Sequence, residues 1–425
     1  MEEKLLIGIS EKPESLLRWL VLSFQHVFAM FGATVLVPLL TGLSVSVALV
    51  ASGVGTLIYI ASTKGKVPVY LGSSFAYIAA ITLAGRSGHF GSAYVGLMAV
   101  GVIYVIVSII IQFTGSGWIK KLLPPVVIGP VIIIIGLSLA YVAVESAGLD
   151  GKSGWRVPLV ALITFATVIL VSLLGRGFFR IVPFIIAIGV GYIASLALGI
   201  VNGEVFTELS FFAVPDFVFL GTYRLDFTAV LMFIPIAFVT IAEHIGDHTV
   251  LSEVTGKDFI KDPGLDKTIR GDGLATFVSA LIGGPANTTY GENTGVVAMT
   301  RVGSVYVVGL AAIIAILLGF LGYVQGFINS IPWAVIGGMT IILYGLIASN
   351  GVKILIRARV DLGNMRNLII MSTMLVIGLG GAMIPLNEAV SLEGMSLAAT
   401  AGIVLNLILP KEIKIKKVEE VPVEA

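Results

Sequence analysis

The stretch Leu123-Pro-Pro-Val-Val-Ile-Gly-Pro-Val-Ile-Ile-Ile134 recurs 208 residues later as Ile331-Pro-Trp-Ala-Val-Ile-Gly-Gly-Met-Thr-Ile-Ile342, and six of the twelve positions are identical. Gln25-His26 corresponds to Glu243-His244 at an offset of 218, and Gly72-Ser73-Ser74 lies about as far from Thr289-Tyr290-Gly291. Any two apolar helices share some residues through composition alone. Here, however, Pro and Gly recur in place, and the offsets stay close to half of the 425-residue chain. We therefore predict two related halves.

The composition around these repeats is strongly apolar, with 57% hydrophobic and 12% charged residues. Soluble domains average about 25% charged residues, so most of this chain must have lipid as its solvent. The net charge of +1 excludes a broadly basic surface for nucleic acid. The absence of cysteine excludes disulfides, thiolate metal ligands and cysteine nucleophiles.

Apolar runs of the length needed to cross a bilayer, about 20 residues, recur along the chain. The ninth and tenth runs are too short and too rich in Gly, Pro, Asn and Thr for ordinary helices, and the third begins unusually, with Pro68 and then Gly72-Ser73-Ser74. We predict about fourteen spans, near 17–40, 43–62, 67–85, 91–113, 122–143, 157–175, 181–200, 229–248, 271–283, 287–300, 303–324, 331–349, 367–385 and 391–409.

The distribution of basic residues supports an even number of spans. If the N-terminus is cytoplasmic, 22 of the 26 Lys and Arg residues fall in cytoplasmic segments, and the exceptions are Arg86, Lys152, Arg156 and Arg224. Lys and Arg are enriched in cytoplasmic loops, and an odd number of spans would destroy this skew. We therefore predict a multi-pass protein of the cell membrane with both termini in the cytoplasm.

Seven spans in each half place the second repeat in the opposite orientation from the first. Inverted repeats are typical of secondary transporters. The predicted fold class is an all-α polytopic membrane protein built from two inverted repeats of seven spans. Its predicted parts are a cytoplasmic tail at 1–16, the first repeat at 17–200, an extracellular connection at 201–228, the second repeat at 229–409 and a cytoplasmic tail at 410–425.

Three acidic residues, Glu243, Asp247 and Glu292, fall inside predicted spans. A carboxylate at mid-bilayer costs ~2.5–3.5 kcal/mol, so the three predict a shared polar cavity. Glu243 and Asp247 are four residues apart and therefore face one side of a helix. Two carboxylates this close cannot both stay ionised at low cost in a dry site, so at least one is predicted to bind a proton reversibly. The alternative is that Asp247 lies at a helix end and contacts water.

Glu292 lies in the stretch Pro285-Ala-Asn-Thr-Thr-Tyr-Gly-Glu-Asn-Thr-Gly295, which is too polar and too rich in Gly for a continuous buried helix. At bilayer depth, irregular backbone is tolerated only where it pairs internally or lines a cavity. We predict that an extended piece here pairs antiparallel with Gly72-Ser73-Ser74-Phe75-Ala76 and leads into a half-helix. Free N–H groups near Gly291 would then face a ligand. The alternative role of these small residues is close helix packing.

These groups together predict a site for a flat heterocycle. Glu243 and Glu292 supply hydrogen-bond acceptors, the main chain at Gly291 supplies N–H donors, and an aromatic face comes from Phe75, Tyr290 or Tyr344. A pyrimidine lactam needs this combination, because its ring N–H groups require acceptors and its carbonyls require donors. No basic residue lies at a predicted mid-membrane position, which argues against a strongly anionic substrate.

The histidines admit two interpretations. His244 and His248 are four residues apart, which is a metal-ligand spacing, so a membrane metallohydrolase is an alternative. The sequence His-Glu-x-x-His is absent, however, and the remaining histidines are His26 and His89. We predict no metal site, and we expect a hydrogen-bond network between helices that involves Gln25, His26, His244 and Asn293.

Several of these motifs resemble the nucleobase–ascorbate transporter family. Glu292-Asn-Thr-Gly295, followed after four residues by Thr300-Arg-Val-Gly303, is similar to the family signature. The resemblance extends over essentially the whole chain through Gln25-His26, Tyr70-Leu-Gly-Ser-Ser-Phe-Ala76 and Glu243-His244. Asn287-Thr-Thr-Tyr-Gly-Glu-Asn293 resembles the uracil permease branch, because purine-transporting relatives usually carry Gln at the position of Glu292.

The resemblance implies a core domain of spans 1–4 and 8–11, a gate domain of spans 5–7 and 12–14, proton-coupled uptake and a homodimer. It implies that Glu243 and Glu292 bind the substrate and that Phe75 and Gly291 make further contacts. The residues implied to line the pocket are Ala33, Tyr290 and Tyr344. Some uracil permeases have His at the position of Asp247, whereas some purine and urate relatives have Asp.

We therefore predict symport of uracil with a proton into the cell, in which Glu243 and Asp247 carry the proton. We expect neither enzymatic activity nor a cofactor. One alternative is a purine, xanthine or urate permease on the same scaffold, coupled to protons or sodium. Another is an anion channel or transporter of related seven-plus-seven architecture.

Overall fold

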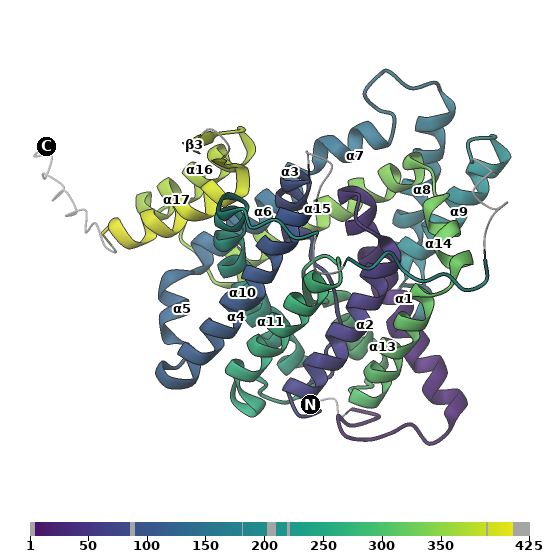
Figure 1. Cartoon of the computed structure of the whole chain (residues 1–425), viewed down its shortest axis with the longest axis horizontal. Helices are drawn as coiled ribbons and strands as arrows, with labels where there is room; N and C mark the ends of the chain where they lie inside the picture. The colour runs from purple at the N-terminus through teal and green to yellow at the C-terminus, as the bar shows by residue number, and fades with distance from the viewer. Residues whose placement is uncertain are drawn as a thin grey trace, which may run out of the picture.

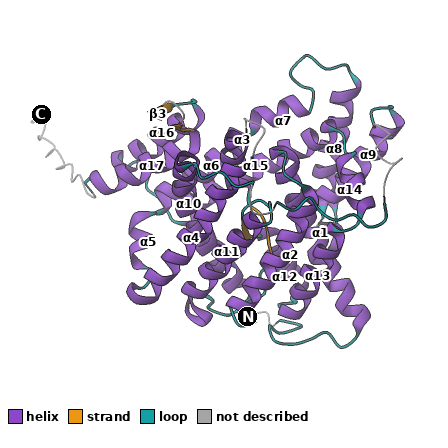
Figure 2. Cartoon of the chain, in the orientation of Figure 1, coloured by secondary structure: helices purple, strands orange, loops and turns teal. Residues whose placement is uncertain are grey.

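The computed structural model describes residues 5–85, 90–180, 182–201, 210–218, 222–387 and 390–410, and most of these residues are helical (Figure 1, Figure 2). Parts of both predicted tails and of the predicted connection at 201–228 lie outside the described residues, as do Arg86 and His89. The first half contains α1 (Leu16–Thr41), α2 (Val45–Ser62), β1 (Leu71–Ser73), η1 (Phe75–Tyr77), α3 (Ile78–Ala84), α4 (Gly91–Thr114), α5 (Gly117–Leu122), α6 (Pro125–Ser138), α7 (Ala140–Ser146), α8 (Arg156–Leu174), η2 (Gly177–Arg180) and α9 (Pro183–Ala197).

The second half follows the same pattern of helices interrupted by a short strand. It contains α10 (Phe227–Thr255), η4 (Ile260–Gly264), α11 (Leu265–Leu281), β2 (Asn287–Thr289), α12 (Gly291–Thr300), α13 (Val305–Gly319), α14 (Gly322–Asn329), α15 (Trp333–Arg357), α16 (Met365–Leu379), β3 (Met383–Asn387), β4 (Val390–Glu393) and α17 (Gly394–Ile408). The predicted helical fold class, with short extended pieces in the third and tenth spans, is confirmed.

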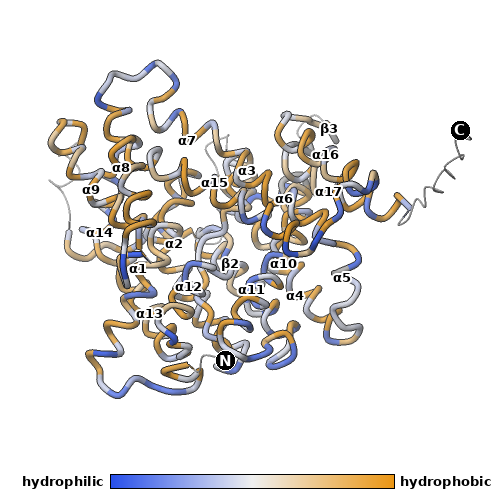
Figure 3. The backbone as a smooth tube through the Cα atoms, turned by 180° about the vertical axis from the view of Figure 1, so that it is seen from behind, coloured by the Kyte–Doolittle hydropathy of each residue, from blue (hydrophilic) through white to orange (hydrophobic). Residues whose placement is uncertain are grey.

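Seven helices of the described chain are long and apolar enough to cross a membrane, and five shorter apolar helices accompany them. Figure 3 shows hydrophobic residues along the helices and hydrophilic residues in the loop after α7 and in the loops near the N-terminus. Large apolar side chains such as Phe113, Leu173 and Val376 are exposed on the outside of the chain. Such a surface is suited to lipid rather than to water. The number of fourteen crossings stays a prediction.

The ninth segment differs from its prediction. It is the continuous 17-residue helix α11, which begins at Leu265 rather than near residue 271. Near its start, α11 carries Asp266, Lys267, Arg270 and Asp272. Because of these charges, the beginning of the helix does not read as an apolar run. The thirteenth segment ends earlier than predicted, because α16 stops at Leu379 and the β3–β4 hairpin follows.

The two broken spans meet at the centre of the molecule. Strands β1 and β2 pair antiparallel, with Leu71 opposite Thr289 and Ser73 opposite Asn287 (Figure 2). Hydroxyl groups of the flanking helices satisfy the outer edges of the strands. Thr56 Oγ1 accepts from the Leu71 N–H at 2.9 Å, and Thr276 Oγ1 donates to the Asn287 carbonyl at 3.0 Å. The main-chain polar groups of this crossing are therefore bonded inside the protein.

The two helices that the repeated stretches open, α6 and α15, pack against each other. A Cβ atom on Gly129 would lie 3.1 Å from the carbonyl oxygen of Gly351, and one on Gly136 would lie 2.6 Å from the amide nitrogen of Ala348. Glycine at these positions lets the two backbones approach closely, which is a common way for membrane helices to pack.

The N-terminal segment binds the connection between α12 and α13. Leu6 N–H donates to the Arg301 carbonyl at 2.8 Å, and Gly303 N–H donates to the Ile7 carbonyl at 3.0 Å. Ile7 is buried in a small cluster with Val302 and Val307. Residues 6–9 therefore hold the end of the half-helix α12 in place.

We predict that Gly72→Ala destabilises the strand crossing. The added Cβ would overlap the Tyr290 ring and lie 2.7 Å from Thr34 Oγ1, so a cost of ~1–3 kcal/mol is expected for overpacking. Thermal unfolding of the purified protein in detergent should show a lower midpoint than for Gly345→Ala, whose new Cβ meets no atom within 4 Å. Equal midpoints for the two variants would contradict this account.

Candidate functional site

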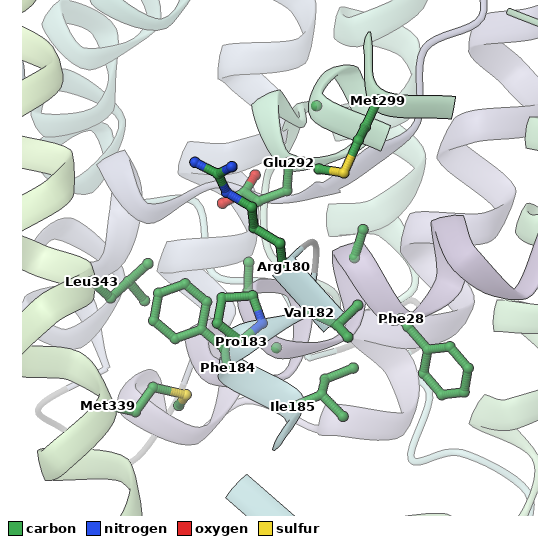
Figure 4. A pocket seen from close by; sticks show the side chains of 14 residues that line it. Phe28, Arg180, Val182, Pro183, Phe184, Ile185, Glu292, Met299, Met339 and Leu343 are labelled. Carbon is green, nitrogen blue, oxygen red and sulfur yellow. The ribbon is translucent and has the colours of Figure 1, made fainter. Parts of the chain in front are cut away.

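A cavity of about 240 Å³ lies between α1, α12, α15 and the segment that joins η2 to α9 (Figure 4). Its lining is mostly apolar and includes Phe28, Ala33, Phe184, Met299 and Leu343. The described lining residues that carry charge are Glu292 and Arg180. The cavity therefore has the character of a small-molecule site, with apolar walls and few polar groups.

Glu292 reaches this cavity because the tenth span changes from strand to helix directly before it. β2 ends at Thr289, the extended Tyr290 caps the helix, and α12 begins at Gly291. Glu292 is thus in the first turn of α12, where free N–H groups and the helix dipole stabilise negative charge. An added Cβ on Gly291 would meet no atom within 4 Å, so the main chain there is open to a ligand.

Glu243 and Asp247 lie four residues apart on α10, which packs against α12. Both side chains are half-buried. Their charges interact with each other and with that of Glu292. The three predicted carboxylates are therefore neighbours, although Glu292 lines the cavity described above and the other two do not.

A fourth carboxylate, Asp272 on α11, was not among the candidate residues predicted from the sequence. Asp272 Oδ2 is 2.7 Å from His244 Nδ1, and both side chains are fully buried. The prediction that only three acidic residues lie within spans is therefore wrong. The signal was present, because Asp272 falls inside the predicted ninth segment, but it sits near the start of that segment and among other charged residues.

The stacked rings of His244 and His248 have centroids 3.9 Å apart, and every ring nitrogen has a hydrogen-bond partner. His244 Nε2 lies 3.0 Å from Thr268 Oγ1, and His248 Nδ1 donates to the His244 carbonyl at 2.8 Å. The hydroxyl of Tyr59 bonds His248 Nε2. Within the described residues, no cluster of three or more His, Asp or Glu side chains could hold a metal ion. The two histidines connect α2, α10 and α11.

The predicted aromatic residues gather beside the strand crossing. Ala33, Tyr290 and Tyr344 belong to one buried cluster, and Phe75 packs against that cluster. The Tyr290 hydroxyl donates to the Ser73 carbonyl at 2.9 Å and accepts from Thr34, so it connects the two broken spans. The Tyr344 hydroxyl is buried and has no hydrogen-bond partner among the described residues. Of these residues only Ala33 lines the cavity.

A second set of bonds joins α1 to α12. Asn293 Nδ2 lies 3.1 Å from His26 Nδ1 and 3.0 Å from the His26 carbonyl oxygen. The neighbouring Gln25 has a buried Oε1 without a partner in the described part of the chain. His26 and Asn293 therefore fix the helix that carries Glu292 against α1.

Comparison with known proteins supplies an independent observation. A family model described as "Permease family" matches residues 17–387. The uracil permease of Bacillus caldolyticus is 49% identical over 412 residues, which cover 96% of this chain and 95% of that protein. The uracil permease of Bacillus subtilis is 46% identical over 422 residues and covers 96% of each chain.

Solved structures share the fold at low sequence identity. The transmembrane domain of the cyanobacterial bicarbonate transporter BicA superposes with a TM-score of 0.62 at 15% identity, covering 94% of this chain and 99% of that one. Murine Slc26a9, an anion transporter in the inward-facing state, gives a TM-score of 0.69 at 12% identity over 93% of this chain and 68% of that one. These likenesses establish that the chain shares the fold of those two structures.

We predict that Asp272→Ala destabilises the protein by ~1–3 kcal/mol, because His244 Nδ1 would lose its buried partner. Asp272→Asn should cost less, since its amide oxygen can still accept a hydrogen bond from that nitrogen. Thermal unfolding of both variants in detergent tests the ranking. If the alanine variant were as stable as the asparagine variant, the bond would not matter to the fold.

Proposed function

Because the chain belongs to the nucleobase–ascorbate transporter family, we propose that it carries uracil into the cell in symport with a proton. The observation that carries this proposal is the position of Glu292, at the start of a half-helix and on the wall of a mostly apolar cavity. Full-length similarity to uracil permeases at 46–49% identity supports the choice of substrate.

The chemistry of uracil fits the groups gathered here. Its two ring N–H groups are donors, so we assign them to the carboxylates of Glu292 and Glu243. Its carbonyl groups are acceptors, and we assign one of them to the N–H group of Gly291, at the start of α12, where the main chain is open to a ligand. Phe75, half-buried beside the strand crossing, offers a flat apolar face. We propose these four residues as the direct contacts and Ala33, Tyr290 and Tyr344 as residues that shape the pocket.

The proposed proton coupling is supported by the electrostatic cost of several ionised carboxylates in this region. Glu243, Asp247 and Glu292 repel one another when ionised, and protonation of the Glu243–Asp247 pair relieves that repulsion. The loaded carrier would then change sides without a buried net charge. A proton that moves inward gains ~2.3 kcal/mol per 100 mV. Since about 1.4 kcal/mol corresponds to a factor of ten, this suffices for more than tenfold accumulation.

We also propose that both termini are cytoplasmic and that the protein is a homodimer of the cell membrane. The first proposal rests on the skew of Lys and Arg residues between the two sets of loops. The second rests on the family resemblance alone. We propose no enzymatic activity.

Anion transport is a second candidate function, because Arg180 lines the cavity and weakens the sequence argument that no cation is near. Glu292 lines the same cavity, however, and its carboxylate would repel an anion. A purine or xanthine substrate is compatible with the same acceptors. Uptake competition by uracil, xanthine, adenine, bicarbonate and sulfate separates these candidates.

We predict that Glu292→Gln lowers uracil uptake more than tenfold, because one acceptor becomes an amide whose N–H₂ group opposes a ring N–H. Uptake of labelled uracil into proteoliposomes measures the effect. Glu253→Gln, the same change at an exposed position of α10, should retain full uptake. Unchanged transport by Glu292→Gln would refute the assignment of this residue.

We predict that an inward proton gradient drives more than tenfold accumulation of uracil and that a protonophore abolishes it. Asp247→Asn should retain uracil exchange across the membrane but accumulate less, because it removes one of the two proton-sharing carboxylates. Accumulation driven equally well by a sodium gradient alone would contradict proton coupling. Full accumulation by Asp247→Asn would exclude a role for this residue in coupling.

A further inference from the structure

Arg180 and Glu292 line the same cavity but come from different groups of helices. Arg180 ends η2, directly before α9, and α9 packs against α8 and α15. Glu292 belongs to α12, which packs against α1 and α10. Figure 4 shows the guanidinium and the carboxylate directed toward the same part of the cavity. Any movement of one group of helices past the other would change the distance between these two charges.

Neither charge is paired with another residue in the described part of the chain. The ion pairs found there join other side chains, and no hydrogen bond ties the Arg180 side chain to a neighbour. The other residues that line the cavity are mostly apolar, and Val182, Phe184 and Met299 are among them. In such surroundings the attraction between opposite charges is stronger than in water. Arg180 is therefore free to pair, and its preferred partner across the cavity is Glu292.

Other acidic groups near Glu292 add negative charge, which a cation would offset. Glu243, Asp247 and Asp272 all lie within electrostatic range of one another. A carrier that has released both uracil and its proton retains uncompensated negative charge at Glu292. Glu292 is exposed to the cavity in this structure. Closing the empty site over its ionised carboxylate would bury an unpaired charge, which is costly unless a cation lies nearby.

We propose that Arg180 pairs with the ionised Glu292 when the site is empty and so permits the unloaded carrier to return. The proposal rests on the proposed function and deepens it. In the loaded carrier, a ring N–H group of uracil donates to the Glu292 carboxylate, and Arg180 remains in the solvent-facing part of the cavity. After release, the long Arg180 side chain reaches Glu292 and forms the two parallel N–H···O bonds that a guanidinium offers a carboxylate. Arg180 is thus a positioning residue for the return step and does not contact the substrate.

Two transport assays separate the return step from the others. Net uptake into uracil-free proteoliposomes under a proton gradient requires the empty carrier to return. Exchange of labelled uracil with unlabelled uracil inside the vesicles does not, because the carrier crosses loaded in both directions. Arg180→Gln should lower net uptake at least tenfold and leave exchange within twofold of wild type. Arg180→Lys, which retains the charge but not the paired geometry, should give intermediate net uptake.

The matched control is Arg176→Gln, because Arg176 is exposed in the same connection and does not line the cavity. It should leave both assays unchanged. An equal loss of net uptake and exchange in Arg180→Gln would overturn the proposal, since it would indicate substrate contact or misfolding. Unchanged net uptake would overturn it as well. If the wild-type protein exchanged no uracil at all, the proposed function would fail, and this result is distinguishable from failure of the Arg180 proposal alone.

Discussion

The architecture depends on one constraint: a main chain inside lipid must satisfy its own polar groups. Two spans leave helical geometry in the middle of the bundle, at β1 and β2. They are tolerated because each strand supplies the partners that the other lacks, and because Thr56 and Thr276 bond their outer edges. The unwound parts of these two spans therefore meet in one place. That place is where α3 and α12 begin, and the N-terminal end of α12 carries Glu292.

The same crossing explains why the polar residues of distant segments come together. Tyr290 bonds Ser73 and Thr34, and Asn287 Nδ2 donates to the Ala51 carbonyl at 3.1 Å. Behind the strands, the histidines of α10 join α2 and α11. Each of these bonds satisfies a polar group that would be costly to leave without a partner in an apolar environment. The result is a hydrogen-bonded polar centre, and the carboxylates of Glu243, Asp247 and Glu292 lie at its border.

The cavity lies between the helices that surround the strand crossing and a second group of helices. α1 and α12 form one wall, while α15 and the segment before α9 form the other. Rigid groups with a ligand site between them suit alternating access, because the site can open to either side when one group moves against the other. A charged residue on each wall then couples that movement to the charge of the site.

The amino-acid sequence by itself determined the membrane class, the repeat and the existence of the broken spans. Helical periodicity, the Pro and Gly residues that recur at 123–134 and 331–342, and the polar stretch at 285–295 are local features that act within a few residues. The antiparallel pairing of residues 71–73 with 287–289 was also predicted, because main chain that leaves helical geometry at bilayer depth needs a partner inside the protein. Other neighbours were decided by the tertiary structure alone. The burial of Asp272 against His244 and the position of Arg180 beside the cavity of Glu292 both bring together residues that are far apart along the chain. Their proximity depends on how whole helices pack, which no local pattern encodes.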